Sequence, residues 1–501
     1  MLDYLTKRPM LICGICCCII SVSAYYSRPS LILISVVCSA AMGIMLYRNV
    51  SFSLVFAIFM VFLMILSSII ATGNAEYCSK LVDKKYNCKL AVCDITYEAN
   101  DYFIADMQVL KSDTLKSGLR ISAGYNDIEL QPGQIINACV SIENHNDTYK
   151  PELFSRKIYI SGKIENLEIA THEKDLILTG FFKVRKYIEK TFFKEFGYNQ
   201  ASTLCAVIFG ENAYFSDDFY SKLKSTGVSH VMVVSGMHLS ILLALTTFFF
   251  KKLFFNRYAL AIITVISVLS LTALCGFTMS ILRAGVTYLL VALGFVIKRD
   301  GVPENTLGAA VSLILIVSPF SFMSIAFRLS VLSTLGIVAV AIKINESVRE
   351  LMPLKSAFAI FSAITVTNCA FLFTLPVTVS EFGYISLISV FSNLLIGIAV
   401  TFMIWFAFLG LIVNLFSQSL SQIFFFPCGI LTKYVNSSIN NLGELDFAVM
   451  ELPKGVAFLA TVFILFVFWY MTACKKTINQ KRTKEKQKII ISQINKKINW
   501  K

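Results

Sequence analysis

The stretch Thr226-Gly227-Val228-Ser229-His230-Val231-Met232-Val233-Val234-Ser235-Gly236-Met237-His238-Leu239-Ser240 contains two of the chain's four histidines. The surrounding sequence is apolar enough to enter a bilayer, where polar side chains cost free energy. Neither insertion nor solubility requires two imidazoles and a Ser-Gly pair at this place. We therefore expect residues 226–240, called the box below, to have a function.

The composition is typical of a membrane protein that crosses the bilayer several times. Of the 501 residues, 56% are hydrophobic and 15% are charged, against about 25% charged in soluble proteins. The net charge of +14 would suit a nucleic-acid-binding protein, but ten Lys or Arg between Lys475 and Lys501, against Glu485 alone, supply +9 of it. A basic tail after an apolar span is first a cytoplasmic end that contacts anionic lipid. We prefer that interpretation to a dedicated DNA-binding tail.

The N-terminal part, residues 1–73, contains apolar runs at 10–26, 31–47 and 52–72. Each run is long enough for a membrane span, so we predict a unit of three transmembrane helices. Two further spans follow the first run directly, which favours a retained anchor over a signal peptide. With a cytoplasmic N-terminus, three crossings place the next segment outside the cytoplasm.

Residues 74–180 are the only long polar segment, and they predict a small extracytoplasmic β-barrel of OB-like type. The expected strands are Leu90–Tyr97, Tyr102–Leu110, Gly118–Ala123, Gln134–Glu143, Lys157–Ile164 and Leu176–Leu178. The segment has twelve Lys and Arg against sixteen Asp and Glu. An acidic balance argues against a main DNA site, so a spacer or assembly role is preferred. One disulfide among Cys78, Cys88, Cys93 and Cys139 would suit this compartment, with its pairing left open.

Residues 181–474 predict a helical membrane domain, and residues 475–501 a basic cytoplasmic tail. The domain starts with a basic amphipathic helix at 181–197, expected along the membrane surface. Later apolar runs bring the total to ten or eleven crossings. The run 385–414 is long for one crossing, so a break near Gly397 is expected. Those later runs cover 258–276, 279–297, 305–318, 327–342, 356–376, 385–414 and 456–474.

The box leaves two chemical alternatives open. In a helix Ser235 and His238 share a face, while His230 and His238 lie about 80° apart. A Ser with a nearby His could serve an intramembrane hydrolase, but Ser-x-x-His on one helix suits that chemistry poorly. A metal on the two histidines would need further ligands, the nearest being Glu211, Asp217 and Asp218. We predict no catalytic residue, no metal and no cofactor.

Two arginines lie within apolar sequence, Arg283 and Arg328. An arginine at mid-bilayer costs about 2.5–3.5 kcal/mol, so each should face a partner or a wet cavity. Glu381 is a candidate partner. Together these residues could line a polar lane for an anionic substrate. Alternatively, both arginines snorkel from the ends of their spans.

The order of these motifs resembles the ComEC-type competence proteins, the inner-membrane channels for DNA uptake in natural transformation. The family pattern is Gly-Asp/Glu, Thr-Gly-x-x-His-x-x-x-x-Ser-Gly-x-His, Arg-Ala, Phe-x-Leu-Ser, a Pro and Asn-Leu-Leu. In this chain the matching residues are Gly210-Glu211, the box, Arg283-Ala284, Phe327-Arg328-Leu329-Ser330, Pro376 and Asn393-Leu394-Leu395. The resemblance covers nearly the whole chain.

The chain departs from the family pattern at Met237, where Leu is usual, and at Arg328, where Gln is usual. It also lacks the Pro that often follows Asn-Leu-Leu. Many members continue into a metallo-β-lactamase-like domain with a His-x-His-x-Asp-His motif, which this sequence does not contain. We therefore expect no nuclease activity of its own.

The resemblance implies a channel in the cell membrane that imports single-stranded DNA without regard to sequence. It implies cytoplasmic termini, membrane lipid around the helices, and a separate nuclease, DNA receptor and cytoplasmic motor as partners. The resemblance does not decide whether the protein forms a homo-oligomer. The alternatives are a paralogue that moves another anionic solute or has lost transport, and an intramembrane hydrolase. The expected functional residues are His230, Ser235, Gly236, His238, Arg283, Arg328, Glu381 and Asn393.

Overall fold

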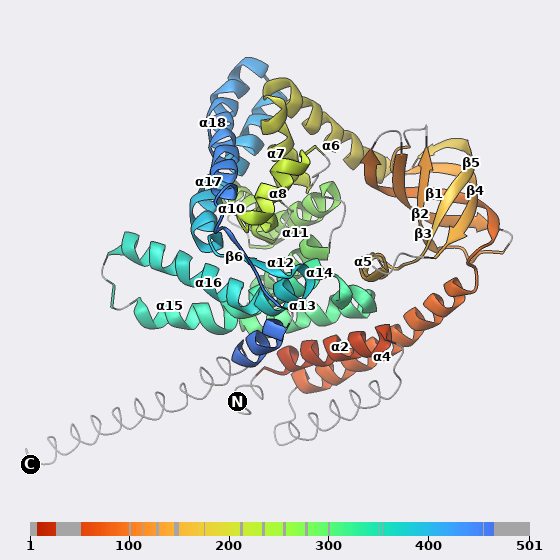
Figure 1. Cartoon of the computed structure of the whole chain (residues 1–501), viewed down its shortest axis with the longest axis horizontal. Helices are drawn as coiled ribbons and strands as arrows, with labels where there is room; N and C mark the ends of the chain where they lie inside the picture. Colours follow the sequence, from red (N-terminus) through yellow and green to blue (C-terminus); the bar gives the residue numbers. More distant parts are fainter. Residues whose placement is uncertain are drawn as a thin grey trace, which may run out of the picture.

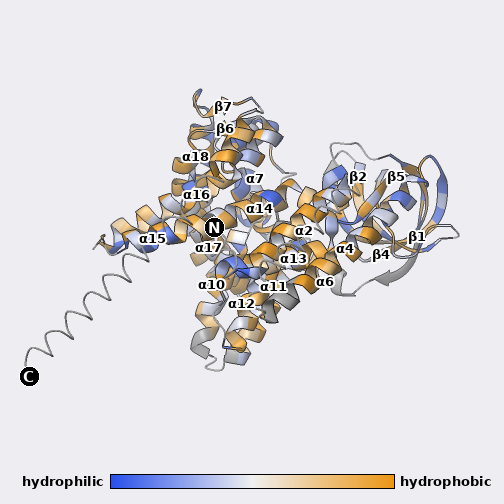
Figure 2. Cartoon of the chain, turned by 90° about the horizontal axis from the view of Figure 1, so that it is seen from below, coloured by the Kyte–Doolittle hydropathy of each residue, from blue (hydrophilic) through white to orange (hydrophobic). Residues whose placement is uncertain are grey.

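A computed structural model shows a β-barrel beside a larger helical part (Figure 1). The long helices of the helical part are mostly hydrophobic along their length, whereas the barrel is mixed (Figure 2). The structure describes residues 8–26, 52–99, 102–112, 114–126, 130–144, 150–174, 176–210, 214–232, 236–253, 257–275, 279–298, 301–349, 351–352, 354–453 and 455–464. The expected span at 31–47 and the basic tail at 475–501 lie outside these residues.

Five strands close the barrel in the order β1-β2-β3-β5-β4, with β4 pairing back to β1. The neighbours are antiparallel except β3 and β5, which run parallel. Alternating apolar residues such as Leu90, Met107 and Ile136 fill the interior and are fully buried, as the period of a strand requires. The strands are β1 Lys85–Ala99, β2 Tyr102–Ser112, β3 Arg120–Asn126, β4 Gln134–Glu143 and β5 Ile158–Lys174, with helix α5 Lys150–Ser155 before β5.

The closed barrel is therefore confirmed, but two sequence predictions about this segment are wrong. Leu176–Leu178 is not a strand, because it forms the first turn of helix α6 (Leu176–Glu195). Three apolar residues define no period, and the amphipathic run that follows extends back over them. The disulfide expected among Cys78, Cys88, Cys93 and Cys139 is not formed in this structure either.

Four of the described helices are long and apolar enough to cross a membrane: Ile58–Ser79, Ile325–Val348, Lys355–Phe382 and Ser389–Asn414. The last of these is α17, which is one unbroken helix, so the expected break near Gly397 is wrong. A Cβ at Gly397 would meet nothing within 4 Å. This glycine therefore marks neither a kink nor a close approach.

Besides α6 and α17, the described helices of the helical part are α2 Pro9–Tyr25, α4 Phe52–Ser79, α7 Tyr198–Phe209, α8 Asp217–Ser225, α9 Ser229–Met232, α10 Gly236–Leu253, α11 Arg257–Leu274, α12 Met279–Val296, α13 Pro303–Val317, η2 Pro319–Met323, α14 Ile325–Gly336, η3 Ile337–Ala341, α15 Ile342–Val348, α16 Lys355–Phe382 and α18 Gln418–Gly443. The first three of the four helices of membrane-spanning length lie in α4, in the continuous run α14-η3-α15 and in α16. A short hairpin pairs β6 Tyr384–Ser386 with β7 Val449–Glu451.

The N-terminal helix α2 packs closely on α13. Gly308 lies directly against the backbone of Met10 and Leu11, so a side chain there would clash with it. Arg8 and Glu304 form an ion pair of 3.2 Å between the starts of the two helices. The N-terminal helices are thus part of the helical body, and α4 leads from it into the barrel (Figure 1).

Candidate functional site

The box begins with a tight turn against the start of α17. Gly227 has φ +71°, a conformation that favours glycine. A Cβ at Gly227 would come within 2.8 Å of the Cβ atoms of Ser386 and Ser389. Asn393, one helical turn after Ser389, is half-buried on α17. The turn therefore brings the first part of the box beside the segment that carries the Asn-Leu-Leu motif.

The two box histidines are placed on separate helices that lie close together. His230 is on α9 and hydrogen-bonds the backbone of Gly227, whereas His238 is on α10 and hydrogen-bonds the backbone of Val231. His238 is only 2% exposed. Apolar side chains surround it, namely Val207, Ile208, Leu239, Leu242, Leu271, Ile281 and Ile404. These contacts hold the imidazole between α7, α11 and α17.

Ser235 lies outside the described residues, as do Val233 and Val234. Its expected role stays a prediction. Glu211 also lies outside them. Within the described part of the chain, no three His, Cys, Asp or Glu side chains gather as a metal site would require.

Arg283 lies at the contact between three motif segments. Its side chain is on α12 and the residue is 7% exposed. Its Nε donates a hydrogen bond to the hydroxyl of Ser330 on α14, at 2.7 Å. A Cβ added at Gly236, the first residue of α10, would lie 3.1 Å from its Nη2. The box, the Arg-Ala motif and the Phe-x-Leu-Ser motif therefore meet at this guanidinium.

No carboxylate pairs with Arg283 among the residues that the structure describes. A hydroxyl and a glycine backbone surround the charge instead. A buried cation without a counter-ion is costly in a membrane protein. A neutral side chain at position 283 would avoid this free-energy cost.

Tyr288 is a member of this cluster that the sequence did not single out. Its hydroxyl donates a hydrogen bond to Ser240 Oγ at 2.6 Å, and Ser240 Oγ donates to the carbonyl of Gly236 at 2.7 Å. This chain of hydroxyls ties α12 to the start of α10. The sequence contains one signal that could have indicated Tyr288, namely its position five residues after Arg283. Its partner Ser240 is the last residue of the box.

Arg328 has the partner that its position predicts. Its Nη2 lies 2.8 Å from Glu381 Oε1, and the two side chains are 23% and 32% exposed. Glu381 is near the end of α16. The structure therefore pairs Glu381 with Arg328 and leaves Arg283 in a separate environment.

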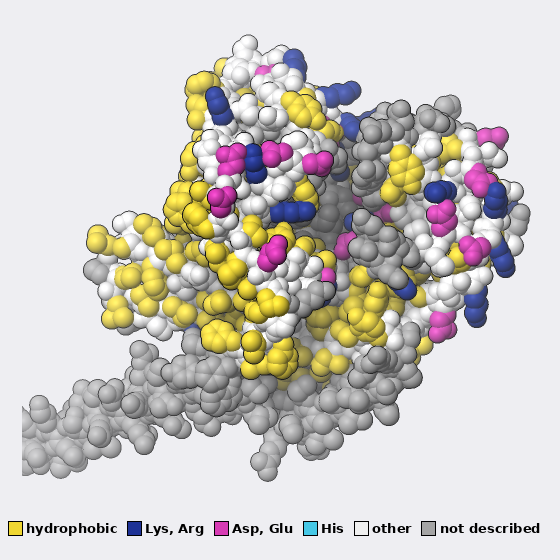
Figure 3. Space-filling model, viewed as in Figure 1, with side chains coloured by type: hydrophobic (Ala, Val, Ile, Leu, Met, Phe, Trp, Pro, Cys, Tyr) yellow, Lys and Arg dark blue, Asp and Glu magenta, His cyan; other side chains and the backbone are white. Residues whose placement is uncertain are grey.

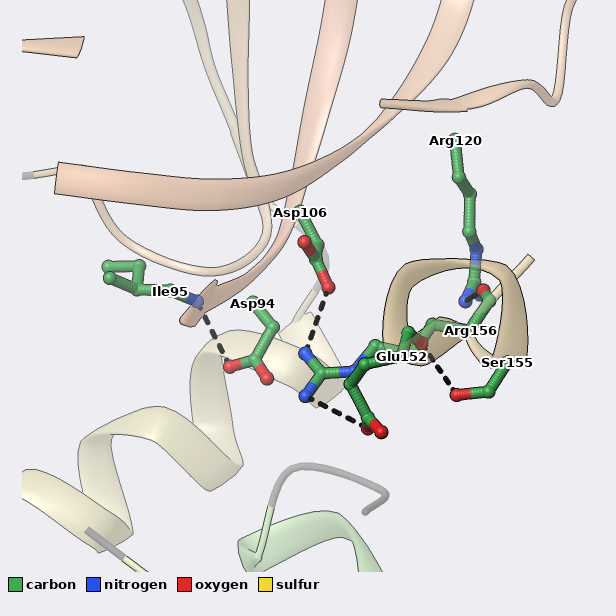
Figure 4. Close-up of polar contacts among 7 residues, drawn as sticks. All are labelled: Asp94, Ile95, Asp106, Arg120, Glu152, Ser155 and Arg156. Carbon is green, nitrogen blue, oxygen red and sulfur yellow. Dashed lines mark hydrogen bonds and ion pairs between the residues drawn. The ribbon is translucent and has the colours of Figure 1, made fainter. Parts of the chain in front are cut away.

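A second polar cluster lies between the barrel strands and the segment around α5 (Figure 4). Arg156, just after α5, lies 3.4 Å from Asp106 on β2 and 3.7 Å from Glu152. Glu152 also accepts a hydrogen bond of 2.7 Å from Ser324, which precedes α14. We call the residues Asp94, Asp106, Glu152 and Arg156 the junction. Burial raises the pKa of Asp94 to about 6, against the opposing charges of Arg185 and Arg156, and burial also raises the pKa of Asp106.

Apolar helices of membrane-spanning length, joined to a closed β-barrel, define an integral membrane protein that also contains a folded β-barrel. Within this class the chain belongs to the competence protein family, whose model matches residues 207–477. The matched region includes the box, Arg283, Arg328, Glu381 and Asn393.

A curated relative is ComE operon protein 3 of Bacillus subtilis (strain 168). The two sequences are 23% identical over 277 residues, which are 55% of this chain and 34% of the relative. The match therefore spans about a third of the relative's length. No solved structure matches the chain.

Proposed function

We propose that this protein imports single-stranded DNA across the cytoplasmic membrane during natural transformation. Membership of the competence family supports a role in DNA uptake, and it favours transport over intramembrane hydrolysis. The observation that carries the proposal is the buried guanidinium of Arg283, on which three separate motif segments converge. A cation without a carboxylate partner among the described residues suits a path for a polyanion.

In this proposal Arg283 balances phosphate charge as the strand passes, and the box shapes the path around it. The polar groups of the path come from His230, Ser235 and His238. The close contact between helices is at Gly236. Arg328 with Glu381, and Asn393 on α17, lie along the same route. Binding is independent of base sequence, because phosphate contacts carry no sequence information.

The proposed topology has cytoplasmic termini and several crossings of the plasma membrane. Residues 1–73 form the N-terminal membrane helices, 74–180 an extracytoplasmic barrel, 181–474 the channel domain and 475–501 a basic tail. The OB-like description of the barrel is supported by its five strands in the order β1-β2-β3-β5-β4 and by the parallel pair β3–β5.

The partners proposed are the single strand itself, membrane lipids, a DNA receptor, a cytoplasmic motor and a separate nuclease. A homo-oligomer would be compatible with this scheme. The protein acts as a channel and carries out no covalent chemistry on the strand.

The test is a deletion strain of the source organism, complemented with wild type or with His238→Ala. Transformation frequency and uptake of labelled DNA are measured, and membrane levels are compared by immunoblot. We expect loss on deletion, rescue by wild type and failure of His238→Ala at equal protein level. Unchanged transformation on deletion would refute the proposal and favour a paralogue that moves another anionic solute.

A further inference from the structure

A large cavity lies between the barrel and the helical part. Its volume is about 1310 Å³, whereas pockets for drug-sized molecules occupy roughly 300–1,000 Å³. Figure 3 shows the hollow between the two parts, with hydrophobic side chains on its helical side. The cavity is separate from the cluster around Arg283, which does not line it.

The helical wall of the cavity is apolar. One face of α12 lines it with Leu282, Val286, Leu289, Leu290 and Leu293, which recur at helical spacing. At 1.5 Å per residue the stripe is about 16 Å long. That is roughly half of the ~30 Å hydrocarbon core of a bilayer, the depth of one leaflet. The stripe therefore has the length of a single acyl chain.

This wall is also open on one side. Leu293 on α12 is 55% exposed, and Val317 at the end of α13, which also lines the cavity, is 65% exposed. Apolar side chains this exposed, on helices of a membrane protein, face lipid. An amphiphile could therefore enter the cavity sideways from the bilayer.

The barrel wall of the cavity is cationic. Four basic side chains of the barrel segment line it, against the two carboxylates of Asp94 and Asp106; they are Lys116, Arg120, Arg156 and Lys157, and Arg185 of helix α6 adds a fifth cation to the lining. Arg156 is held by Asp106 and Glu152 at the junction, and Arg185 by Glu189 at 3.0 Å. Arg120 Nη1 donates a hydrogen bond to the backbone carbonyl of Arg156, at 3.4 Å.

Arg120 and Lys157 form a like-charged pair at this wall. Arg120 pairs with Ile158 across β3 and β5, and its Nη1 lies 3.4 Å from the carbonyl oxygen of Arg156. Lys157 stands between those two residues in the chain, so Arg120 lies beside it. In agreement, partial burial and repulsion by the charge of Arg120 lower the pKa of Lys157. Among the described residues neither forms an ion pair with a carboxylate, although the charge of Arg120 also acts on the carboxyl of Asp106. An anion placed between Arg120 and Lys157 would relieve their repulsion.

We propose that this cavity binds one anionic phospholipid of the surrounding membrane. Its phosphate lies between Arg120 and Lys157, and an acyl chain lies on the apolar stripe of α12. Basic pockets between transmembrane helices on the cytoplasmic side bind acidic lipid headgroups, and the same pairing of cations with a lipid phosphate is proposed here on the barrel side. Single-stranded DNA would satisfy the cations but would leave the apolar stripe without a partner, so the lining favours the lipid.

The test uses the purified, delipidated full chain in detergent, with bound lipid counted by native mass spectrometry. The probes are phosphatidylglycerol and phosphatidylcholine with identical acyl chains. We expect wild type to retain phosphatidylglycerol about tenfold better, because both lipids carry the phosphate but only phosphatidylcholine would also bring a choline cation against Arg120 and Lys157, and that repulsion would cost roughly 1.4 kcal/mol. Equal retention of the two lipids would overturn the proposal.

Two variants locate the headgroup. Arg120→Gln/Lys157→Gln should lose the preference for phosphatidylglycerol. The matched control Lys85→Gln/Lys163→Gln should keep it, because those lysines are exposed on the barrel and pair with Glu165 and Glu143. A preference that survives in the first double variant would refute the assigned headgroup site.

A third variant and two competitors separate the sources of phosphate. Leu290→Trp fills the apolar stripe and should reduce retention of phosphatidylglycerol. Inorganic phosphate and a twenty-nucleotide oligothymidylate should both fail to displace the lipid from wild type. Unchanged retention in Leu290→Trp, or displacement by free phosphate, would indicate a simple anion site. Displacement by the oligonucleotide would assign the cavity to DNA, and either result would overturn the lipid assignment.

Discussion

The junction and the cluster around Arg283 treat buried arginines in opposite ways. At the junction, Arg156 has two carboxylates, Asp106 and Glu152, within 4 Å. In the helical part, Arg283 is more deeply buried and has a serine hydroxyl as its partner. An arginine that is paired with carboxylates stabilises the contact between the segments that carry them. An arginine without a carboxylate partner can instead bind an anionic ligand. The contrast indicates that Arg156 has a structural role and Arg283 a functional one.

The largest effect is expected from changing the space around Arg283. Gly236→Leu would push on the guanidinium and on Ala284, because even a Cβ there lies 3.1 Å from each. We expect transformation to fall about a hundredfold, the factor for losing roughly 3 kcal/mol of charged contacts. The measurement is transformation frequency at matched membrane level.

Gly397→Leu is the matched control for that variant. Gly397 is also a glycine within an apolar helix, but a side chain there would meet nothing within 4 Å. Its transformation frequency should stay near wild type. Equal losses of transformation in Gly236→Leu and Gly397→Leu would show that any bulky residue in these helices is damaging. The proposed functional role of Arg283 would then have no support from this experiment.

At the junction the expected effect is on stability. Arg156→Ala removes the compensating charge from Asp106, which is 8% exposed. Breaking such a pair costs about 3 kcal/mol, so the midpoint of thermal unfolding in detergent should fall by roughly 6 °C or more. Lys163→Ala, which removes an exposed lysine from the barrel, should change the midpoint little. An unchanged midpoint for Arg156→Ala would contradict a structural role.

The junction should also respond to pH through Asp94. Burial raises its pKa to about 6 from 3.8, so the folded state binds a proton that the unfolded state releases. The stabilisation is complete below pH 3.8 and is lost as the pH rises through 6. Asp94→Asn should therefore be more stable than wild type by up to about 3 kcal/mol at pH 7 and by roughly half as much at pH 5. Thermal unfolding at both pH values checks this, and a constant difference would argue against titration of Asp94.

The smallest effect is expected at Arg328 and Glu381. Their ion pair is partly exposed, and such pairs are worth about 0–1 kcal/mol. Arg328→Gln/Glu381→Gln removes both charges together and should leave DNA uptake within about threefold of wild type. A loss of DNA uptake as large as that of Gly236→Leu would show that this ion pair is as important for uptake as the surroundings of Arg283.

The sequence predicted the class of the protein and the position of the barrel, because hydrophobic length and alternation are local properties. Four of the expected strands, those in β1 to β4, are close to the observed ones, and Glu381 is the partner of Arg328, since few charged residues occur in the apolar sequence. Leu176–Leu178 was wrong because three apolar residues suit a strand and a helix equally.

The contacts that assemble the candidate site could not be predicted in the same way. A serine or tyrosine in an apolar helix commonly bonds its own backbone, so nothing local links Tyr288 to Ser240 or Ser330 to Arg283. The cavity likewise arises where α12 and α13 pack beside β2, β3 and α5. Such arrangements depend on tertiary packing between segments that are distant in the sequence.

The central claim is that the charge of Arg283 serves the transported strand. The most direct measurement compares internalised labelled DNA in cells that carry Arg283→Lys or Arg283→Gln at equal membrane level. Glutamine can still hydrogen-bond Ser330 but is neutral, whereas lysine keeps the charge. We predict that Arg283→Lys retains much of the uptake and that Arg283→Gln falls to the level of the deletion strain. Normal import by Arg283→Gln would contradict the account.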